Sequence, residues 1–212
     1  IWIYKENIHG LSASAKDQLR GEQMGFIFQQ FNLLPYLSVR DNILLPAHLF
    51  AKRKAAALAQ FGSLDHALRY YMNHLGLSAD LVNQAAHRLS IGQQQRVAAA
   101  RAFMGSPSIV IADEPTSALD VSVQARFLDL LQELQGKLNF ACLFISHDLA
   151  VVDILSHRIA VMQNGVLIEV GDRDQILKNP ENEYTKRLIS AVPVPDPAEQ
   201  AIRREARLAN KN

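Results

Sequence analysis

The stretch 109–145, IVIADEPTSALDVSVQARFLDLLQELQGKLNFACLFI, decides the fold class of this chain. Residues 109–112 and 140–145 are short apolar runs, which are typical of buried strands in a parallel sheet. Residues 121–138 lie between them and are predicted to form a helix with one apolar face, made of Val123, Phe127, Leu130, Leu131 and Leu134. A strand, a helix and a second strand in this order predict an α/β layer fold.

The rest of the chain carries signals of the same two kinds of element. Residues 158–162 and 166–170 are predicted strands, and Gln163-Asn164-Gly165 between them is typical of a tight hairpin turn. Further strands are expected at 1–4 and 25–29, and a short polar helix or a turn at 12–20. Helices are expected at 39–51 (interrupted at Pro46), 64–75, 93–104, 149–155, 174–178 and 184–191.

Composition narrows the possible classes of protein. Of 212 residues, 49% are hydrophobic and 20% charged, which favours a globular chain over a disordered one. No apolar run approaches the roughly 18 residues that a membrane-spanning helix needs. Twenty-two basic and 21 acidic residues leave a net charge of +1, which does not favour a nucleic-acid-binding function. The single cysteine, Cys142, excludes an internal disulfide and a cysteine-cluster metal site.

Two adjacent carboxylates, Asp113 and Glu114, end the apolar strand at 109–112. Ligands of open α/β sheets bind at the carboxyl ends of the strands. A Mg²⁺ ion held by Asp113, with Glu114 orienting or deprotonating a water, would suit phosphoryl transfer. From these residues alone, a solvated loop after a strand is an equally good interpretation.

A second candidate site lies in Leu89-Ser90-Ile91-Gly92-Gln93-Gln94-Gln95-Arg96, which leads into a helix. Ser90 can cap that helix, and Gly92 lets an anion approach the backbone closely. The free N–H groups and the positive dipole end of a helix start attract an anion. By itself, the segment favours an ordinary capped helix over an anion site.

Several motifs occur in one order along the chain. They are Gln29 within Phe26-Ile27-Phe28-Gln29-Gln30, then Ser90 to Arg96, Asp113-Glu114, Ser117-Ala118-Leu119-Asp120 and Ser146-His147-Asp148. Together they resemble the nucleotide-binding subunits of ABC transporters, over residues 1 to about 192.

The resemblance implies an α/β fold of the P-loop NTPase type, namely an ABC ATPase core with a mostly parallel sheet. It implies a partial ABC ATPase domain at 1–192, in which about 31–105 form a helical subdomain that carries the signature motif. Residues 193–212 would follow as a linker and a charged tail, because they contain Pro193, Pro195, Pro197 and many charged residues.

The resemblance also implies roles for three residues in catalysis. Asp113 would bind Mg²⁺, Glu114 would be the catalytic glutamate, and His147 would be the switch histidine at the γ-phosphate of ATP.

Further residues would bind the nucleotide or its metal. Gln29 would lie near Mg²⁺ and the attacking water, and is a candidate ligand of both cofactors, ATP and Mg²⁺. Ser90, Gly92 and Gln93 would contact the γ-phosphate of ATP bound to the opposite subunit. Asp120 would lie at the dimer interface, and it can at the same time serve as the N-cap of the helix that starts at Val121.

Partners follow from the same resemblance. The intact protein would work as a homodimer or with a paired ATPase subunit, and it would power transport through transmembrane permease subunits. Phe31 to Tyr36 would contact the permease. We expect no nucleic-acid partner, and a cytoplasmic, peripheral location on the inner face of the membrane.

Two features depart from the family pattern. The 212 residues contain no G-x-x-x-x-G-K-[ST] phosphate loop; Gly136-Lys137 has the wrong neighbours and ends a helix. We therefore expect a chain that is truncated at its N-terminus, begins after the phosphate-loop helix and binds ATP poorly. Ile91 stands where the family usually has glycine, and a β-branched residue resists positive φ and crowds a phosphate.

Alternatives to a transport ATPase remain at this point. The missing loop also suits a catalytically dead fragment or a regulatory remnant. An ABC ATPase of DNA repair or chromosome structure is less favoured, because the interval between Gln29 and Ser90 lacks heptads and cysteines. Residues 25–46 resemble lipoprotein-releasing and macrolide-exporter ATPases, whereas 121–193 are closer to peptide-importer ATPases, so the direction of transport stays open.

Overall fold

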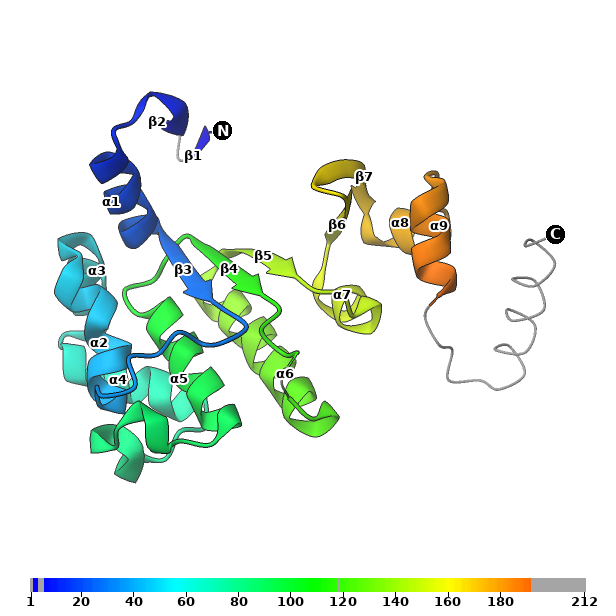
Figure 1. The fold of residues 1–212 in the computed structure, drawn as a ribbon. Coiled ribbons are helices and arrows are strands. Elements are labelled where there is room, and N and C mark those ends of the chain that lie inside the picture. Colours follow the sequence, from blue (N-terminus) through cyan, green and yellow to red (C-terminus); the bar gives the residue numbers. More distant parts are fainter. Residues whose placement is uncertain (1, 4–5, 118, 192–212) are drawn as a thin grey trace. The chain divides into compact units, whose positions relative to one another are not determined.

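The computed structural model describes residues 2–3, 6–117 and 119–191 (Figure 1). The chain divides into two compact units, Ile1–Ser146 and His147–Asn212. The predicted linker with its three prolines and the predicted helix at 198–212 lie outside the described residues, as do the two ends of the predicted strand at 1–4.

A three-stranded parallel sheet forms the centre of the first unit. Its strands are β3 (Met24–Ile27), β4 (Ile109–Asp113) and β5 (Ala141–Ile145), in the order β3-β4-β5. Ile109 pairs with Met24 on one side and with Ala141 on the other. The apolar runs at 109–112 and 140–145 are therefore neighbouring parallel strands, and the predicted α/β class is confirmed.

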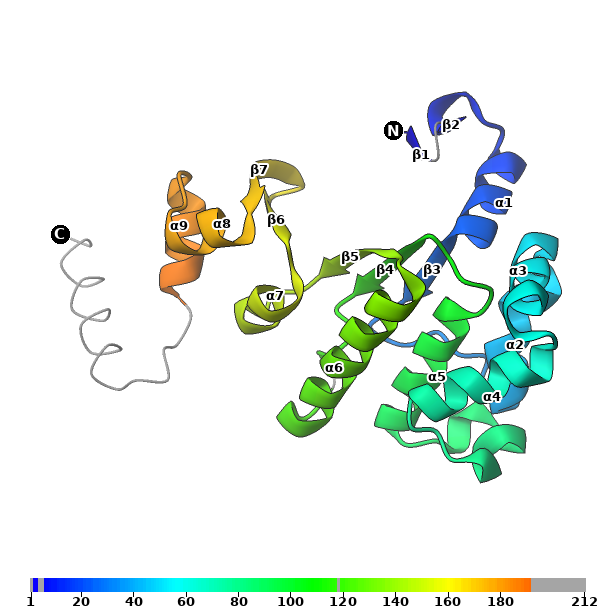
Figure 2. The same cartoon turned by 180° about the vertical axis from the view of Figure 1, so that it is seen from behind.

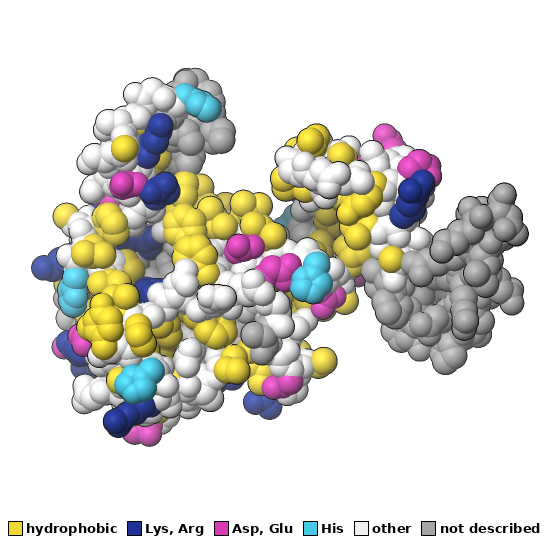
Figure 3. Space-filling view, in the orientation of Figure 1, with side chains coloured by type: hydrophobic (Ala, Val, Ile, Leu, Met, Phe, Trp, Pro, Cys, Tyr) yellow, Lys and Arg dark blue, Asp and Glu magenta, His cyan; other side chains and the backbone are white. Residues whose placement is uncertain are grey.

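The two faces of this sheet differ. Val110 and Ala112 are fully buried, whereas Leu143 and Ile145 on β5 are about half exposed, at 54% and 44%. Apolar side chains are visible over the strands in Figure 3. Burial raises the pKa of the Cys142 thiol to about 11, which leaves very little thiolate at neutral pH.

Helix α6 (Val121–Leu138) connects β4 to β5. Asp120 caps its start, and Asn139, with φ of 51°, ends it in the left-handed conformation. The predicted apolar face is confirmed in part. Val123 and Leu130 are only half-buried, and the buried residues are Phe127, Leu128, Leu131 and Leu134.

Helices fill the segment between β3 and β4 (Figures 1 and 2). They are α2 (Val39–Leu49), α3 (Ala51–Phe61), α4 (Leu64–His74), the short 3₁₀ helices η2 (Ala79–Asn83) and η3 (Ala86–Arg88), and α5 (Ile91–Phe103). Helix α5 contacts both α2 and β3, so it joins the helices to the sheet.

The close contact between α5 and β3 depends on Gly25. A Cβ atom at this position would lie 2.4 Å from the carbonyl oxygen of Ala102, which is too close for any side chain. Ala98, Ala99 and Ala102 are all buried in α5, and their small side chains allow the helix to approach its neighbours closely.

The predicted interruption at Pro46 is wrong. Helix α2 continues through Pro46 to Leu49, and the chain leaves the helical conformation at Phe50, where φ is −123°. A proline removes one backbone hydrogen bond. Burial of Ile43, Leu44 and Ala47 around it holds the helix together.

The described part that precedes β3 contains β1 (Trp2–Ile3), β2 (Glu6–Asn7), the 3₁₀ helix η1 (Ile8–Gly10) and α1 (Ala13–Gln23). β1 and β2 pair antiparallel. The side chain of Ser12 accepts a hydrogen bond from the N–H of Ala15 and so caps α1.

The second unit is built around an antiparallel hairpin. Strands β6 (Arg158–Gln163) and β7 (Val166–Asp172) are joined by Asn164 and Gly165, with φ of 50° and 78°. Positive φ at both turn positions confirms the predicted tight hairpin. Helices α7 (Leu149–Leu155), α8 (Arg173–Lys178) and α9 (Glu183–Ser190) complete the unit, whose buried core consists of Ile159, Val161 and Ile176.

Candidate functional site

The carboxyl edge of the parallel sheet carries the two predicted acids. Asp113 is the last residue of β4, pairs with Ile145 of β5 and is exposed. Glu114 follows it and is half-buried. Because β3 is parallel to β4, Gln29, two residues beyond the end of β3, lies in the loop at the same edge. The structure thus brings Gln29, Asp113 and Glu114 to one edge of the sheet.

Glu114 has an uncommon backbone conformation. Its φ is +47°, which non-glycine residues adopt rarely and which costs conformational energy. Its N–H donates to the carbonyl of Ile145 at 3.0 Å, and its own carbonyl accepts from the Ser117 hydroxyl at 3.0 Å. Strain of this kind persists only where the surroundings fix it, and it is concentrated at functional sites.

Sequence reasoning missed one contact to this loop. The Nε2 atom of Gln95, on α5, donates to the carbonyl of Pro115 at 2.7 Å. Gln95 is completely buried. The spacing of Gln95 to Ala98, Ala99 and Ala102 places it on the buried face of its helix, and this was the available signal.

The loop that contains Gln29 is also held by α5. Gln29 is exposed, and Phe31 and Asn32 after it have positive φ, of 58° and 48°. The Arg101 guanidinium donates to both of their carbonyls, each at 2.7 Å. Burial lowers the pKa of Arg101. The role of Arg101 is therefore to fix this loop.

Ser90 caps α5 as predicted. Its hydroxyl accepts from the N–H of Gln93 at 3.3 Å, and the Gln93 side chain accepts from the N–H of Ser90 at 2.9 Å, which completes a capping box. The predicted role of Ser90 as the cap of this helix is thus confirmed. The same N-terminus still presents a positive dipole end, and binding of phosphate by Ser90, Gly92 and Gln93 stays a prediction.

Ile91 is the first residue of α5, and its φ is not positive. The expected backbone strain at this position is therefore wrong. Its side chain is 55% exposed beside the helix start, so crowding of an anion stays a prediction.

Asp120 caps α6. Its carboxylate accepts from the Ser122 hydroxyl at 2.7 Å and from the N–H of Val123 at 2.9 Å, and these two bonds lower the pKa of Asp120. A Cβ on Gly92 would lie 3.5 Å from Val123, so the starts of α5 and α6 are adjacent. The dimer-interface role of Asp120 stays a prediction, and Ala118 lies outside the described residues.

His147 is the first residue of the second unit and directly precedes the cap of α7. The carboxylate of Asp148 accepts from the N–H of Ala150 at 3.0 Å and so fixes the start of that helix. The chain thus brings His147 directly after β5, and its catalytic role stays a prediction.

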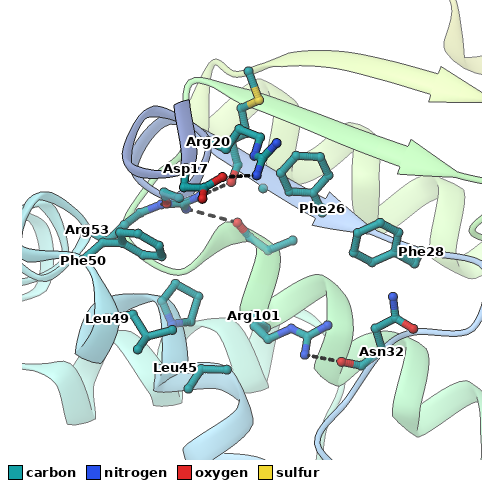
Figure 4. A pocket seen from close by; sticks show the side chains of 15 residues that line it. Asp17, Arg20, Phe26, Phe28, Asn32, Leu45, Leu49, Phe50, Arg53 and Arg101 are labelled. Carbon is teal, nitrogen blue, oxygen red and sulfur yellow. Dashed lines mark hydrogen bonds and ion pairs between the residues drawn. The ribbon is translucent and has the colours of Figure 1, made fainter. Parts of the chain in front are cut away.

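A cavity of about 380 Å³ lies beside the loop of Gln29 (Figure 4). Its lining is mainly apolar, and Figure 4 shows Phe26, Phe28, Leu45, Leu49 and Phe50 around it together with Arg20 and Arg101. These side chains come from α1, from β3 and the loop after it, from α2 with Phe50 at its end, and from α5. The cavity therefore lies between the sheet and the helices.

Arg53 fixes one wall of this cavity. It is 2% exposed and donates to the carbonyls of Gly21 at 3.0 Å and Met104 at 2.9 Å, and also to those of Ala102 and Met24. Burial lowers its pKa to about 10, so the side chain stays charged at neutral pH. Sequence reasoning missed Arg53, whose four bonds all go to backbone carbonyls.

Asp113 suits a magnesium ion that is shared with a phosphate. Mg²⁺ usually takes one or two carboxylates and completes its shell with water and phosphate oxygens. An exposed carboxylate at a sheet edge provides one such ligand. Within the described residues, no group of three or more His, Cys, Asp or Glu side chains could hold a metal on its own. No described helix is long and apolar enough to cross a membrane.

Comparison with known proteins extends these observations. Residues 1–117 match the family described as ABC transporter, and residues 168–211 match that described as oligopeptide/dipeptide transporter, C-terminal region.

Two curated relatives are similar over most of the chain. The glutathione import ATP-binding protein GsiA of Pectobacterium atrosepticum is 40% identical over 197 residues, which cover 91% of this chain and 30% of the relative. The oligopeptide transport ATP-binding protein OppF of Bacillus subtilis is 40% identical over 196 residues, covering 91% of this chain and 62% of the relative. The chain thus spans less than two thirds of either relative.

Solved structures resemble the fold. The post-hydrolysis dimer of the ATP-binding cassette MJ0796 bound to ADP and Pi superposes with a TM-score of 0.68 at 27% identity, covering 81% of this chain and 72% of that one. The protein cbiO1 of Clostridium perfringens superposes with a TM-score of 0.69 at 24% identity, and the match covers 85% of this chain and 68% of cbiO1. At this identity, the likeness supports the fold alone.

Proposed function

The chain belongs to the ABC transporter family, and on that premise we propose that the intact protein is an ATP-binding and ATP-hydrolysing subunit that powers the import of a short peptide. One observation carries this proposal: Asp113 ends the middle strand, and Glu114 follows it, at the same sheet edge as Gln29. An acid pair and an amide at that edge suit a magnesium-bound triphosphate and an attacking water.

Each side chain at the edge would have a distinct task. Asp113 would bind the Mg²⁺ ion, which neutralises charge on the phosphates. Glu114 would orient the attacking water and accept its proton, and Gln29 would help to position both water and metal. The fixed backbone at Glu114 supports this assignment, because a general base must be held at a defined place.

A second copy would complete the nucleotide site. The start of α5, with Ser90, Gly92 and Gln93, would bind the γ-phosphate of ATP held by the partner subunit. Asp120 would lie at the interface, which its place beside that helix start supports. His147 would contact the γ-phosphate. The dimeric state of the similar cassette bound to ADP and Pi agrees with this arrangement.

The partner in the membrane would be a permease. The loop after Gln29, including Phe31 to Tyr36, would contact the permease, and Asn32 in this loop lines the apolar cavity. Both named relatives are transport ATP-binding proteins, one for glutathione and one for oligopeptides, and the C-terminal match is to an oligopeptide/dipeptide transporter region. These names favour import of a short peptide over export. We infer a peripheral place on the inner face of the membrane, where an ATP-binding subunit would contact its permease.

The test uses the full product of the gene that encodes this chain. We expect it to hydrolyse ATP, and to drive uptake of a labelled tripeptide into vesicles that contain its permease subunits. Asp113→Asn and Glu114→Gln should abolish hydrolysis, with ATP binding retained in Glu114→Gln. Asp129→Asn, at an exposed acid on α6, is the matched control and should have no effect. Unchanged hydrolysis in Glu114→Gln would remove Glu114 from its role, and absence of uptake would overturn the peptide substrate.

A further inference from the structure

Gln95 is a fully buried glutamine whose side chain makes a single described hydrogen bond. It lies on the second turn of α5 with 0% of its surface exposed, and its Nε2 atom donates to the Pro115 carbonyl at 2.7 Å. Its Oε1 atom is buried and has no hydrogen-bond partner among the described residues. Burying an unpaired amide oxygen destabilises a protein, so packing alone would favour methionine or leucine at this position.

The bond reaches the peptide that follows the candidate base. Glu114 has φ of +47°, its N–H is bonded to Ile145, and its carbonyl is bonded to Ser117. The next carbonyl along the chain belongs to Pro115 and accepts from Gln95. A strained conformation persists when the groups on both sides of it are held, and Gln95 supplies the hold on the C-terminal side.

We propose that Gln95 is a positioning residue for Glu114, because it ties the backbone of the candidate base to α5, the helix that Ser90 caps. The inference rests on the proposed function, because it assigns Gln95 to the reaction in which Glu114 acts. Within one copy of the protein, the start of α5 would contact the partner's nucleotide, while Glu114 would act on the copy's own nucleotide. Gln95 would therefore connect the two nucleotide sites of the dimer by one hydrogen bond between residues 20 positions apart in the sequence.

The first test measures the link itself in the 212-residue chain. Gln95→Met keeps the length of the side chain and removes the donor. We expect faster hydrogen exchange at the backbone N–H groups of Glu114 and Ser117, by about tenfold, because a buried hydrogen bond of ordinary strength is lost. Unchanged exchange at both sites would overturn the proposal.

Gln23→Met is the matched control. Gln23 is also a buried glutamine, and its side chain accepts one described hydrogen bond, from the Ser108 hydroxyl at 3.1 Å. It lies at the amino ends of β3 and β4, at the edge of the sheet opposite to Glu114. The Gln23→Met variant should leave hydrogen exchange at the backbone N–H groups of Glu114 and Ser117 unchanged. Should Gln95→Met fail to fold, Gln95→Asn gives the same test, because its amide is one methylene too short to reach Pro115.

The second test uses the intact protein. Gln95→Met should lower kcat roughly ten- to a hundredfold and leave the KM for ATP unchanged, since misplacing a reacting group slows chemistry without weakening binding. A rise in KM with an unchanged kcat, or no change in either, would overturn the positioning role. If the wild-type protein does not hydrolyse ATP at all, the proposed function fails, while the exchange result still decides whether Gln95 holds the loop.

Discussion

The guanidinium of Arg101 donates a hydrogen bond to the carbonyl of Phe31 across 70 residues of sequence, with a nitrogen–oxygen distance of 2.7 Å. A second nitrogen of the same group donates to Asn32 at 2.7 Å. Phe31 and Asn32 have positive φ, so the chain makes its turn after Gln29 in a conformation that needs support. Helix α5, which Ser90 caps, thus also holds the loop of Gln29.

This relationship predicts the effect of replacing Arg101. Arg101→Lys keeps the charge but replaces a planar fork with a single point donor, so it cannot satisfy both carbonyls in the same geometry. We expect the free energy of unfolding to fall by about 2 kcal/mol, because hydrogen bonds from a charged donor are lost. Urea unfolding followed by circular dichroism measures this. Arg126→Lys, at an exposed arginine on α6, should change stability little; an equal loss in both variants would contradict the prediction.

The second unit should respond to acid through Glu169. The Thr185 hydroxyl and the backbone N–H of Glu181 stabilise the ionised carboxylate and lower the pKa of Glu169. A carboxyl whose folded pKa lies below its unfolded value stabilises the fold above the unfolded pKa, and this contribution disappears as pH falls through the folded pKa. Glu169→Gln should therefore lower the melting temperature at pH 7, and the difference from wild type should shrink below about pH 4.

Thermal unfolding at pH 7 and pH 3 checks this expectation. Glu181→Gln is the control, because its side chain is exposed and its backbone N–H still bonds to Glu169. A difference between wild type and Glu169→Gln that stays constant over this pH range would show that charge at Glu169 is not responsible.

The 212-residue chain should bind ATP weakly by itself. Its sequence contains no G-x-x-x-x-G-K-[ST] loop, which in this family supplies backbone donors and a lysine to the phosphates. Three charge-assisted hydrogen bonds of about 1.5–3 kcal/mol each are worth roughly a thousandfold or more in affinity. Calorimetric titration of the chain and of the full gene product, under the same conditions, tests this. Micromolar affinity in the chain would refute it.

Ile91 should slow ATP turnover in the intact protein. Its backbone is already helical, so any gain in Ile91→Gly comes from relieved crowding at the helix start rather than from relieved strain. We expect a few-fold higher kcat in Ile91→Gly, with a cost in helix stability of about 1 kcal/mol. Val121→Gly, which also replaces an exposed β-branched first residue of a helix, should leave kcat unchanged. Equal rates for Ile91→Gly and wild type would contradict crowding.

Some of the candidate site was predictable from sequence because its signals are local. Asp113 and Glu114 follow directly on an apolar strand, and Ser90 precedes its own helix by one residue. Pro46 shows the limit of such signals. The local rule predicted an interruption, but burial of Ile43, Leu44 and Ala47 outweighed it, and burial is a property of the whole unit.

The sequence by itself determined the α/β class, the hairpin at Asn164-Gly165 and the order of the acid, amide and serine motifs, because these depend on residues close together in the chain. Only the tertiary structure decided that Glu114 has positive φ, that Gln95 holds the loop after it, that Arg101 holds the loop after Gln29, and that Arg53 holds a wall of the cavity. Those contacts join residues 20 to 70 positions apart. Polar side chains bond there to backbone carbonyls, which every residue possesses, so no pattern of side chains along the sequence identifies the partner.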